Sequence, residues 1–359
     1  MKRFLSIFLA LVLTVGLMAG CGGGKSSSAG EGGPVGVAVL LNGTLGDKAF
    51  FDSAASVADL SKDLNYSFKV VEMTYDETKW MPTLVDFSED PEYPIIIVGT
   101  WQMAEKLQEV APQYPDTQYI IFDSAVDYEL EGMENVYSIE YMQNECSFLA
   151  GAVAGMSTQT GTIGFVGGME NYVINDFLMG YIQGAKHVNP DIKIHIAYTG
   201  DFSDTAKAKE LTLAQINQGA DIVYQVASTA GLGVIDACTE KGVWAIGVDS
   251  DQAEAFLESD PGKANSIMTS ALKLVGESLY RTLKLQEEGS LVYGQRVVMG
   301  LSDGCVGIAK NDIFEAAVSQ EVQDKAEELE QAILSGDIVV DSAFGKTTDE
   351  IEAIRATVR

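Results

Sequence analysis

The hydrophobic positions of this chain fall into short β-rich runs that alternate with longer segments of helical periodicity. Runs rich in valine, isoleucine and aromatic residues predict strands at about residues 35–41, 67–73, 95–99, 119–123, 136–139, 162–167, 192–199, 222–225 and 243–249. Amphipathic spacing predicts helices between them at about residues 50–64, 103–111, 145–157, 177–188, 205–219 and 232–241. Regular strand–helix alternation predicts parallel sheets with helices on both faces. Because the cycle restarts near residue 162, we expect two such lobes.

The C-terminal third of the chain contains too few elements for a third domain. Its pattern predicts a strand at about 265–269, a long helix at 270–288, a strand at 296–301 and an acidic helix at 322–335. We expect these segments to complete both sheets by crossing between the lobes, which forms a hinge. The predicted fold is therefore α/β, with two doubly wound parallel-sheet lobes joined by a hinge. We expect the first lobe at residues 35–144 plus about 264–292, and the second at 145–263 plus about 293–359.

The first residues of the chain have the pattern of a secretory leader, because Lys2 and Arg3 precede an uncharged apolar run at residues 4–18. The run ends in small residues before Cys21, and the segment 17–21 (LMAGC) resembles a bacterial lipobox. This resemblance implies that residues 1–20 are removed and that Cys21 is acylated, which anchors the protein on the extracytoplasmic face of the cell membrane. An uncleaved transmembrane anchor is disfavoured because it needs about 20 apolar residues. Residues 21–34, rich in glycine and serine, are expected to form a flexible tether.

Charge and cysteine content restrict the classes of partner and cofactor. Without Lys2 and Arg3 the chain has 21 basic against 52 acidic residues, a net charge of −31, which disfavours nucleic acid as a partner. Cys146, Cys238 and Cys305 lie in apolar stretches and are expected to be buried free thiols, although an oxidising compartment permits one disulfide. The sequence lacks Cys-x-x-Cys, Gly-x-Gly-x-x-Gly and Walker A motifs, so we expect no metal, nucleotide phosphate or other cofactor.

Polar residues gather directly after the predicted strands. In open parallel sheets ligands bind outside the carboxyl ends of the strands, where loops meet helix N-termini. Asn42 follows the first strand, and Asp123 and Asp249 each end an apolar run. A carboxylate held rigidly there accepts hydrogen bonds from paired donors such as two hydroxyls of a sugar. The alternative for each aspartate is a cap on the following helix.

The loop after the first strand combines glycine, amide, carboxylate and aromatic groups. Phe50 begins the predicted helix and, taken alone, has the pattern of a core residue. With Asp47 beside it, Phe50 is also a candidate platform for stacking on a ring. Stacking of a base on an aromatic side chain contributes ~1–3 kcal/mol, enough to select a ring over an open-chain ligand.

Several blocks of sequence resemble the basic membrane protein family of bacterial lipoproteins, which includes the purine nucleoside receptors of nucleoside importers. The resemblance covers about residues 35–311 and is carried by 46–50 (GDKAF), 148–151 (FLAG), 161–169 (GTIGFVGGM), 219–221 (GAD), 231–234 (GLGV) and 246–252 (IGVDSDQ). It implies a type I periplasmic-binding-protein-like fold that closes on a nucleoside and delivers it to an ABC permease in the membrane.

The resemblance also implies roles for single residues. Phe50 would stack on the base and Asp123 would hydrogen-bond it, with Asn42 and Asp47 as neighbours. For the ribose, the implied residues are Gly247, Asp249 and Lys273. Without the family, Lys273 has the pattern of a solvated lysine on a long helix.

This chain departs from the family at two places, and one expected residue is not identified. Phe51 stands where relatives often have asparagine, and the loop 225–231 has fewer glycines than its counterpart. A second aromatic residue that would complete a sandwich around the base is not identified, and Trp101, Tyr172 and Phe202 are the candidates.

We therefore expect a monomeric, lipid-anchored substrate-binding protein of an ABC importer that takes a nucleoside, with a purine favoured. The alternatives are the same fold binding a sugar or other small metabolite, and a ligand sensor that signals through a partner. An enzyme is disfavoured because His187 and His195 lie away from the strand carboxyl ends and a Gly-x-Ser-x-Gly elbow is absent.

Overall fold

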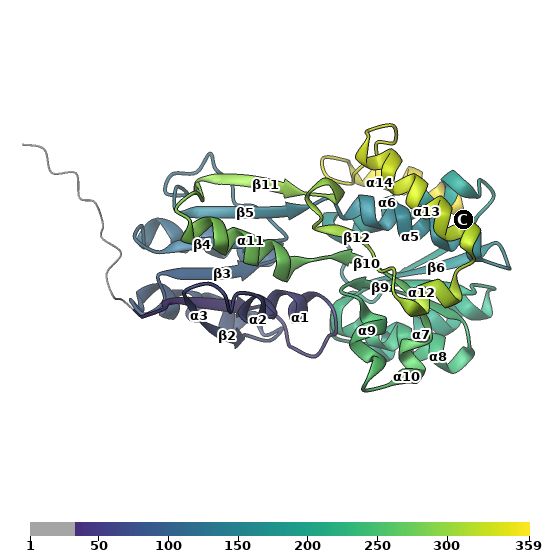
Figure 1. Cartoon of the computed structure of the whole chain (residues 1–359), viewed down its shortest axis with the longest axis horizontal. Helices are drawn as coiled ribbons and strands as arrows, with labels where there is room; N and C mark the ends of the chain where they lie inside the picture. Colours follow the sequence, from purple (N-terminus) through teal and green to yellow (C-terminus); the bar gives the residue numbers. More distant parts are fainter. Residues whose placement is uncertain (1–32) are drawn as a thin grey trace, which may run out of the picture. The chain divides into compact units, whose positions relative to one another are not determined.

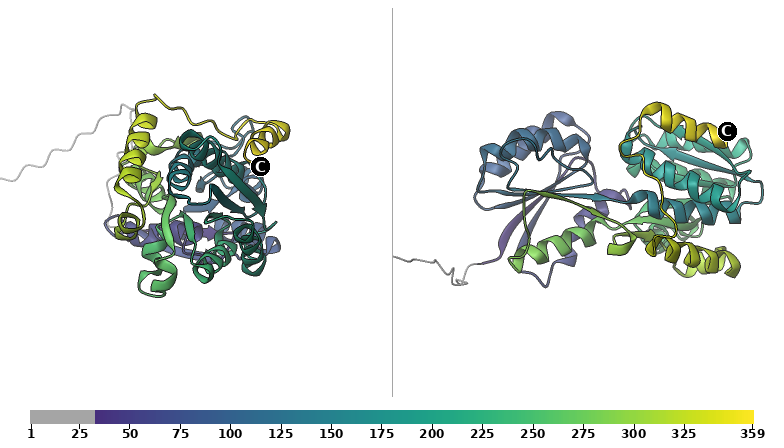
Figure 2. Two further views of the ribbon diagram at one scale, coloured as in Figure 1. Left: turned by 90° about the vertical axis from the view of Figure 1, so that its right-hand side faces the viewer. Right: turned by 90° about the horizontal axis from the view of Figure 1, so that it is seen from above.

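The computed structural model describes residues 33–359, so the predicted leader, Cys21 and most of the predicted tether lie outside the described residues. Residues Pro34–Arg359 form one unit. Its strands form two six-stranded sheets, each at the centre of a lobe (Figures 1 and 2). The prediction of an α/β fold with two parallel-sheet lobes is confirmed.

The first sheet is parallel throughout and has the order β11-β5-β4-β3-β1-β2. Its strands are β1 (Val35–Leu41), β2 (Tyr66–Glu72), β3 (Ile95–Gly99), β4 (Gln118–Phe122), β5 (Val136–Tyr141) and β11 (Gln295–Met299). One face packs on α1 (Phe50–Ala55), α2 (Val57–Leu60) and α11 (Val275–Glu287), the other on α3 (Trp80–Glu89) and α4 (Trp101–Val110). Val39 lies in one apolar cluster and Leu40 in the other, which explains the continuous apolar runs of these strands.

The second sheet has the order β12-β10-β9-β8-β6-β7, and only β12 is antiparallel to its neighbour. Its strands are β6 (Thr162–Gly167), β7 (Lys193–Tyr198), β8 (Ile222–Val226), β9 (Trp244–Asp249), β10 (Ile267–Lys273) and β12 (Val306–Ile308). The helices of this lobe are α5 (Gln143–Ser157), α6 (Tyr172–Val188), α7 (Thr205–Asn217), α8 (Gly231–Lys241), α9 (Gln252–Leu257), α10 (Pro261–Ala264), α12 (Asp312–Ala317), α13 (Gln320–Leu334) and α14 (Thr348–Arg355).

The chain crosses between the lobes at the ends of β5, β10 and β11, as Figure 1 shows for the green segments. This confirms that the C-terminal third completes both sheets, but the expected allocation is wrong for two of its strands. Strand β10, expected within the first-lobe segment 264–292, belongs to the second sheet, and β11, expected in the second lobe, belongs to the first. An apolar run predicts a strand without identifying the strand that it will pair with.

Residues 270–273 are also strand instead of the expected helix, because they pair with β9 on one side and β12 on the other. Helix α3 was not predicted, since Pro82 and the surrounding polar residues interrupt its pattern. The short elements β12, α9, α10, α12 and α14 were also not predicted.

Glycines allow α5 and α6 to pack with their backbones in close approach. A β-carbon on Gly184 would overlap the carbonyl oxygen of Phe148, and one on Gly180 would overlap that of Asn144. This packing fixes α6, which carries Phe177 toward the first lobe.

Cys146, Cys238 and Cys305 are buried free thiols, as predicted. Within residues 33–359, no helix combines the length and the apolar composition that crossing a membrane requires.

Candidate ligand-binding site

A cavity lies where the carboxyl ends of strands from the two sheets face each other; its empty space of about 570 Å³ includes the part that is open to solvent. Its aromatic lining consists of Phe50, Phe51, Tyr75, Trp101, Phe177 and Phe202. Its polar lining consists of Asn42, Thr100, Gln102, Asp123, Asn171, Ser228, Asp249 and Lys273. Both lobes contribute to each set.

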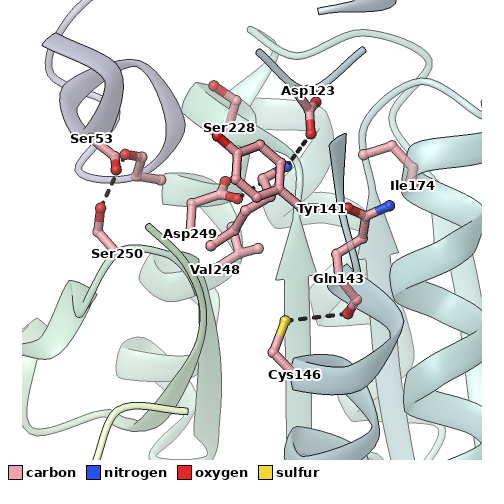
Figure 3. A network of polar contacts seen from close by, with 12 residues as sticks. Ser53, Asp123, Tyr141, Gln143, Cys146, Ile174, Ser228, Val248, Asp249 and Ser250 are labelled. Carbon is pink, nitrogen blue, oxygen red and sulfur yellow. Dashed lines mark hydrogen bonds and ion pairs between the residues drawn. The ribbon is translucent and has the colours of Figure 1, made fainter. Parts of the chain in front are cut away.

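A buried ion cluster forms the floor of the cavity. The Nζ atom of Lys273 lies 2.8 Å from Oδ1 of Asp123 and 3.5 Å from Oδ1 of Asp249. Asp123 follows β4 of the first sheet, whereas Lys273 and Asp249 end adjacent strands of the second, so the cluster joins the lobes. Figure 3 shows Asp123 and Asp249 approaching the cluster from different elements. Lys273 is only 2% exposed, so the reading of a solvated helical lysine is wrong.

The backbone is strained at four positions around the cavity. Thr100, Asp123, Ser228 and Asp249 have φ values of 72°, 61°, 48° and 64°. Side chains other than glycine rarely adopt this left-handed conformation, and it costs roughly 1–3 kcal/mol where the surroundings impose it. Strain of this kind concentrates at functional sites, and sequence patterns give no signal for it.

Burial controls the ionisation of the cluster. It raises the pKa of Asp249 to about 7, against the lowering effect of Lys273, and Asp123 and Asp47 raise it further. Burial also raises the pKa of Asp123, although Lys273 opposes this. For Lys273, burial disfavours the charge, but the two carboxylates hold its pKa above the ordinary value. The site therefore has more acidic groups than its single ammonium can balance.

Two buried oxygen atoms in the described part of the site have no hydrogen-bond partner: Oδ1 of Asn42 and Oδ1 of Asp249. The Asp249 oxygen has only the longer ion-pair contact of 3.5 Å with Lys273. The amide nitrogen of Asn42 already donates to Oγ1 of Thr100 at 2.8 Å, which leaves its oxygen as an acceptor. Because buried polar atoms are nearly always paired, both oxygens are suited to donors on a bound molecule.

Two phenyl rings face the ammonium of Lys273. Its Nζ atom lies 4.7 Å from the ring centroid of Phe50 and 4.9 Å from that of Phe177. Phe177 was missed as a site residue because its spacing from Ile174 and Tyr181 is that of a helical core stripe. Of the three candidates for a second aromatic, Trp101 and Phe202 line the cavity, whereas Tyr172 does not.

Asp47 and Gly247 do not line the cavity. The Asp47 carboxylate accepts hydrogen bonds from the amides of Ala49, Phe51 and Asp52, and so holds the start of α1. Gly247 lies within β9, where a β-carbon would overlap Oγ of Ser270. Asn42, Phe50, Asp123, Asp249 and Lys273 come together in the cavity. The ligand contacts that the resemblance implies for them stay a prediction.

Residues 35–342 match the family described as ABC transporter substrate-binding protein PnrA-like. The chain belongs to this family. It is therefore a substrate-binding protein of the ABC transporter type, which acts outside the cytoplasm with a membrane permease, and its family is not a class of enzymes.

Related proteins agree with this assignment. The "ABC transporter nucleoside-binding protein BmpA" of Lactococcus lactis subsp. cremoris is 29% identical, over 95% of this chain and 99% of the relative. The "Basic membrane protein A2" of Borrelia garinii is 31% identical, over 85% and 87%. An ABC transporter solute-binding protein from Aeropyrum pernix has a similar structure, with a TM-score of 0.77, 26% identity and coverage of 90% of this chain and 98% of that one. The chain thus resembles these relatives in sequence and that solute-binding protein in fold.

The raised pKa of Asp249 predicts an unusual dependence of stability on pH. Between its unfolded pKa near 3.8 and its folded pKa of about 7, the folded state binds more protons than the unfolded state, so this group's contribution falls as pH rises. We compare the free energy of unfolding of ligand-free Asp249→Asn with that of the wild type. The variant's value minus the wild type's should be roughly 1–3 kcal/mol larger at pH 8 than at pH 5. Urea denaturation at both pH values measures this, and an equal difference at the two would contradict it.

Proposed function

We propose that this protein captures a nucleoside, with a purine favoured, in the cavity between its lobes and delivers it to an ABC permease. The observation that carries the proposal is that Phe50 and Phe177 line the cavity beside the buried carboxylate of Asp249, whose Oδ1 atom has no hydrogen-bond partner.

Each of the two rings is suited to stack on a planar base. Both line the cavity, Phe50 from the first lobe and Phe177 from the second, and each lies within 5 Å of the same ammonium nitrogen. Stacking contributes ~1–3 kcal/mol per base and accepts any base, because every base has a π-face.

The ion cluster is suited to hold a ribose. Two neighbouring hydroxyls would donate to Asp249, while the ammonium of Lys273 would donate to a hydroxyl oxygen, and charge-assisted hydrogen bonds of this kind are strong. Asp123 stays paired with Lys273 and directs its nitrogen. Of the other predicted ligand contacts, Asn42 offers a free acceptor to a base N–H, whereas Asp47 and Gly247 would act by shaping the loops around the ligand.

Phe51 would give the base pocket an apolar wall. Its ring packs edge-on against Phe50, with 5.1 Å between centroids, and over Gly43, where a β-carbon would overlap it. The printed name of the Lactococcus lactis relative describes that protein as nucleoside-binding, which supports the same ligand class here.

A binding screen tests the proposal. Adenosine, inosine or guanosine should raise the unfolding temperature of the soluble fragment that begins at residue 22, because a ligand that binds only the folded state stabilises it. Nucleoside 5′-monophosphates should bind at least about tenfold more weakly, since the buried site already has an excess of acidic groups.

Phe50→Leu and Phe177→Leu should each weaken nucleoside binding roughly tenfold or more, because they keep apolar volume but lose the ring face. Phe344→Leu is the control, since Phe344 packs on Tyr172 and does not line the cavity. Binding of a pentose or hexose with no response to any nucleoside would exclude the nucleoside and favour the sugar alternative.

We also propose that the mature protein is a monomer anchored by a lipid on Cys21 after removal of residues 1–20. The support is the sequence of the leader and the family's role at the membrane. Cys21→Ser should abolish incorporation of labelled palmitate and prevent cleavage at residue 20, whereas Cys146→Ser should leave both unchanged. Palmitate incorporation that persists in Cys21→Ser would contradict the anchor.

A further inference from the structure

A set of polar contacts joins the lobes beside the cavity. The Ser228 hydroxyl donates to Oδ2 of Asp47 at 2.9 Å, and the hydroxyls of Tyr75 and Thr229 lie 3.0 Å apart. Close to them, the Ser250 hydroxyl donates to the carbonyl oxygen of Ala49 at 3.1 Å. Asp47, Ala49 and Tyr75 belong to the first lobe, and the three other residues belong to loops of the second (Figure 3 shows Ser228 and Ser250). We call these six residues the clasp.

We propose that the clasp sets the balance between open and closed lobes, and through it the time for which a ligand stays bound. Thr229 and Ser250 are its positioning residues, because neither lines the cavity and both act only on lobe closure. The effect of the clasp on the balance between open and closed lobes does not depend on the identity of the ligand. Its effect on the time for which a nucleoside stays bound rests on the proposed function.

The chemistry of the clasp suits a contact that must reopen. Thr229, Tyr75 and Ser250 use neutral hydroxyls, which exchange their partner for water when the lobes separate. Each such bond therefore favours the closed form modestly, by about three- to tenfold. A ligand whose binding needs the closed form has an apparent affinity that scales with the population of that form.

Both sides of the clasp are held in place before they meet. Asp47 is fixed by three amides at the start of α1 and is fully buried. Ser228 begins the turn η3 (Ser228–Ala230) with a φ of 48°, a strained conformation for serine. A strained backbone persists only where its surroundings impose it, and here the surroundings include the contact with the first lobe. Separation of the lobes would allow Ser228 to relax.

The contacts of the clasp are separable from those of the ligand. Ser228 and Tyr75 line the cavity, so variants of these residues change both. Thr229→Val keeps the shape of the side chain and removes its hydroxyl, and Ser250→Ala removes the other donor. Thr239→Val is the matched control, because the Thr239 hydroxyl bonds only to Ile235 and Ser266 within the second lobe.

The test combines small-angle X-ray scattering with stopped-flow release of adenosine. Without ligand, the double variant Thr229→Val, Ser250→Ala should have a larger radius of gyration than the wild type and Thr239→Val. Its adenosine dissociation rate should rise about ten- to a hundredfold, because the three- to tenfold effects of the two lost bonds multiply. The association rate should change little.

A second arm uses Tyr75→Phe. Combined with Thr229→Val, it should add little to the radius of gyration of either single variant without ligand, because both changes remove the 3.0 Å bond and only the longer 3.5 Å contact of Tyr75 with Ser228 is lost besides. If the double variant Thr229→Val, Ser250→Ala has the same radius of gyration and the same adenosine dissociation rate as Thr239→Val, the clasp proposal is overturned. If adenosine, inosine and guanosine all fail to bind the wild type, the proposed function fails, and the scattering of ligand-free protein still decides on the clasp.

Discussion

The ammonium of Lys273 is buried between two carboxylates, and this requirement organises the region where the lobes meet. A buried charge is tolerated only when it is paired and hydrogen-bonded. Asp123 supplies the close partner from the first sheet and Asp249 the second from the strand beside Lys273. The crossing at the end of β10 therefore matters to both the fold and the site. Lys273 is the last residue of this strand, forms the ion pair between the lobes and lines the cavity.

The charges of the cluster do not balance on their own. One ammonium cannot satisfy two aspartates, which leaves the Asp249 carboxyl with a pKa of about 7 and an oxygen whose contact with Lys273, at 3.5 Å, is too long for a good hydrogen bond. Neutral hydroxyls relieve this by donating hydrogen bonds without adding charge. In the proposed function, the two phenyl rings next to this cluster would suit a ligand that has a sugar on one side and a flat ring on the other. This combination describes a nucleoside better than either a free sugar or a nucleotide.

Much of the fold and part of the site were visible in the sequence. Apolar runs located the strands of both sheets, and the carboxyl-end rule drew attention to Asp123 and Asp249, which both line the cavity. The pairing of β10 and β11 was not visible, because pairing depends on contacts between segments far apart in the chain. For the same reason Phe177 looked like an ordinary core residue of a helix. The cross-lobe bonds of Asp47 and Ser228, and the strain at Ser228, exist only in the folded chain.

The claim that ligand hydroxyls complete the buried cluster is tested most directly by counting protons. Calorimetry of adenosine binding to the wild type, in buffers of different ionisation enthalpy, gives the number of protons released per site. Burial raises the pKa of Asp249 to about 7, so a proton is expected on much of the ligand-free protein at pH 6.5, and hydroxyl donors would lower this pKa. We predict release of a fraction of one proton at pH 6.5 and almost none at pH 8.5. Binding with no proton exchange at pH 6.5, or with uptake of protons, would contradict the account.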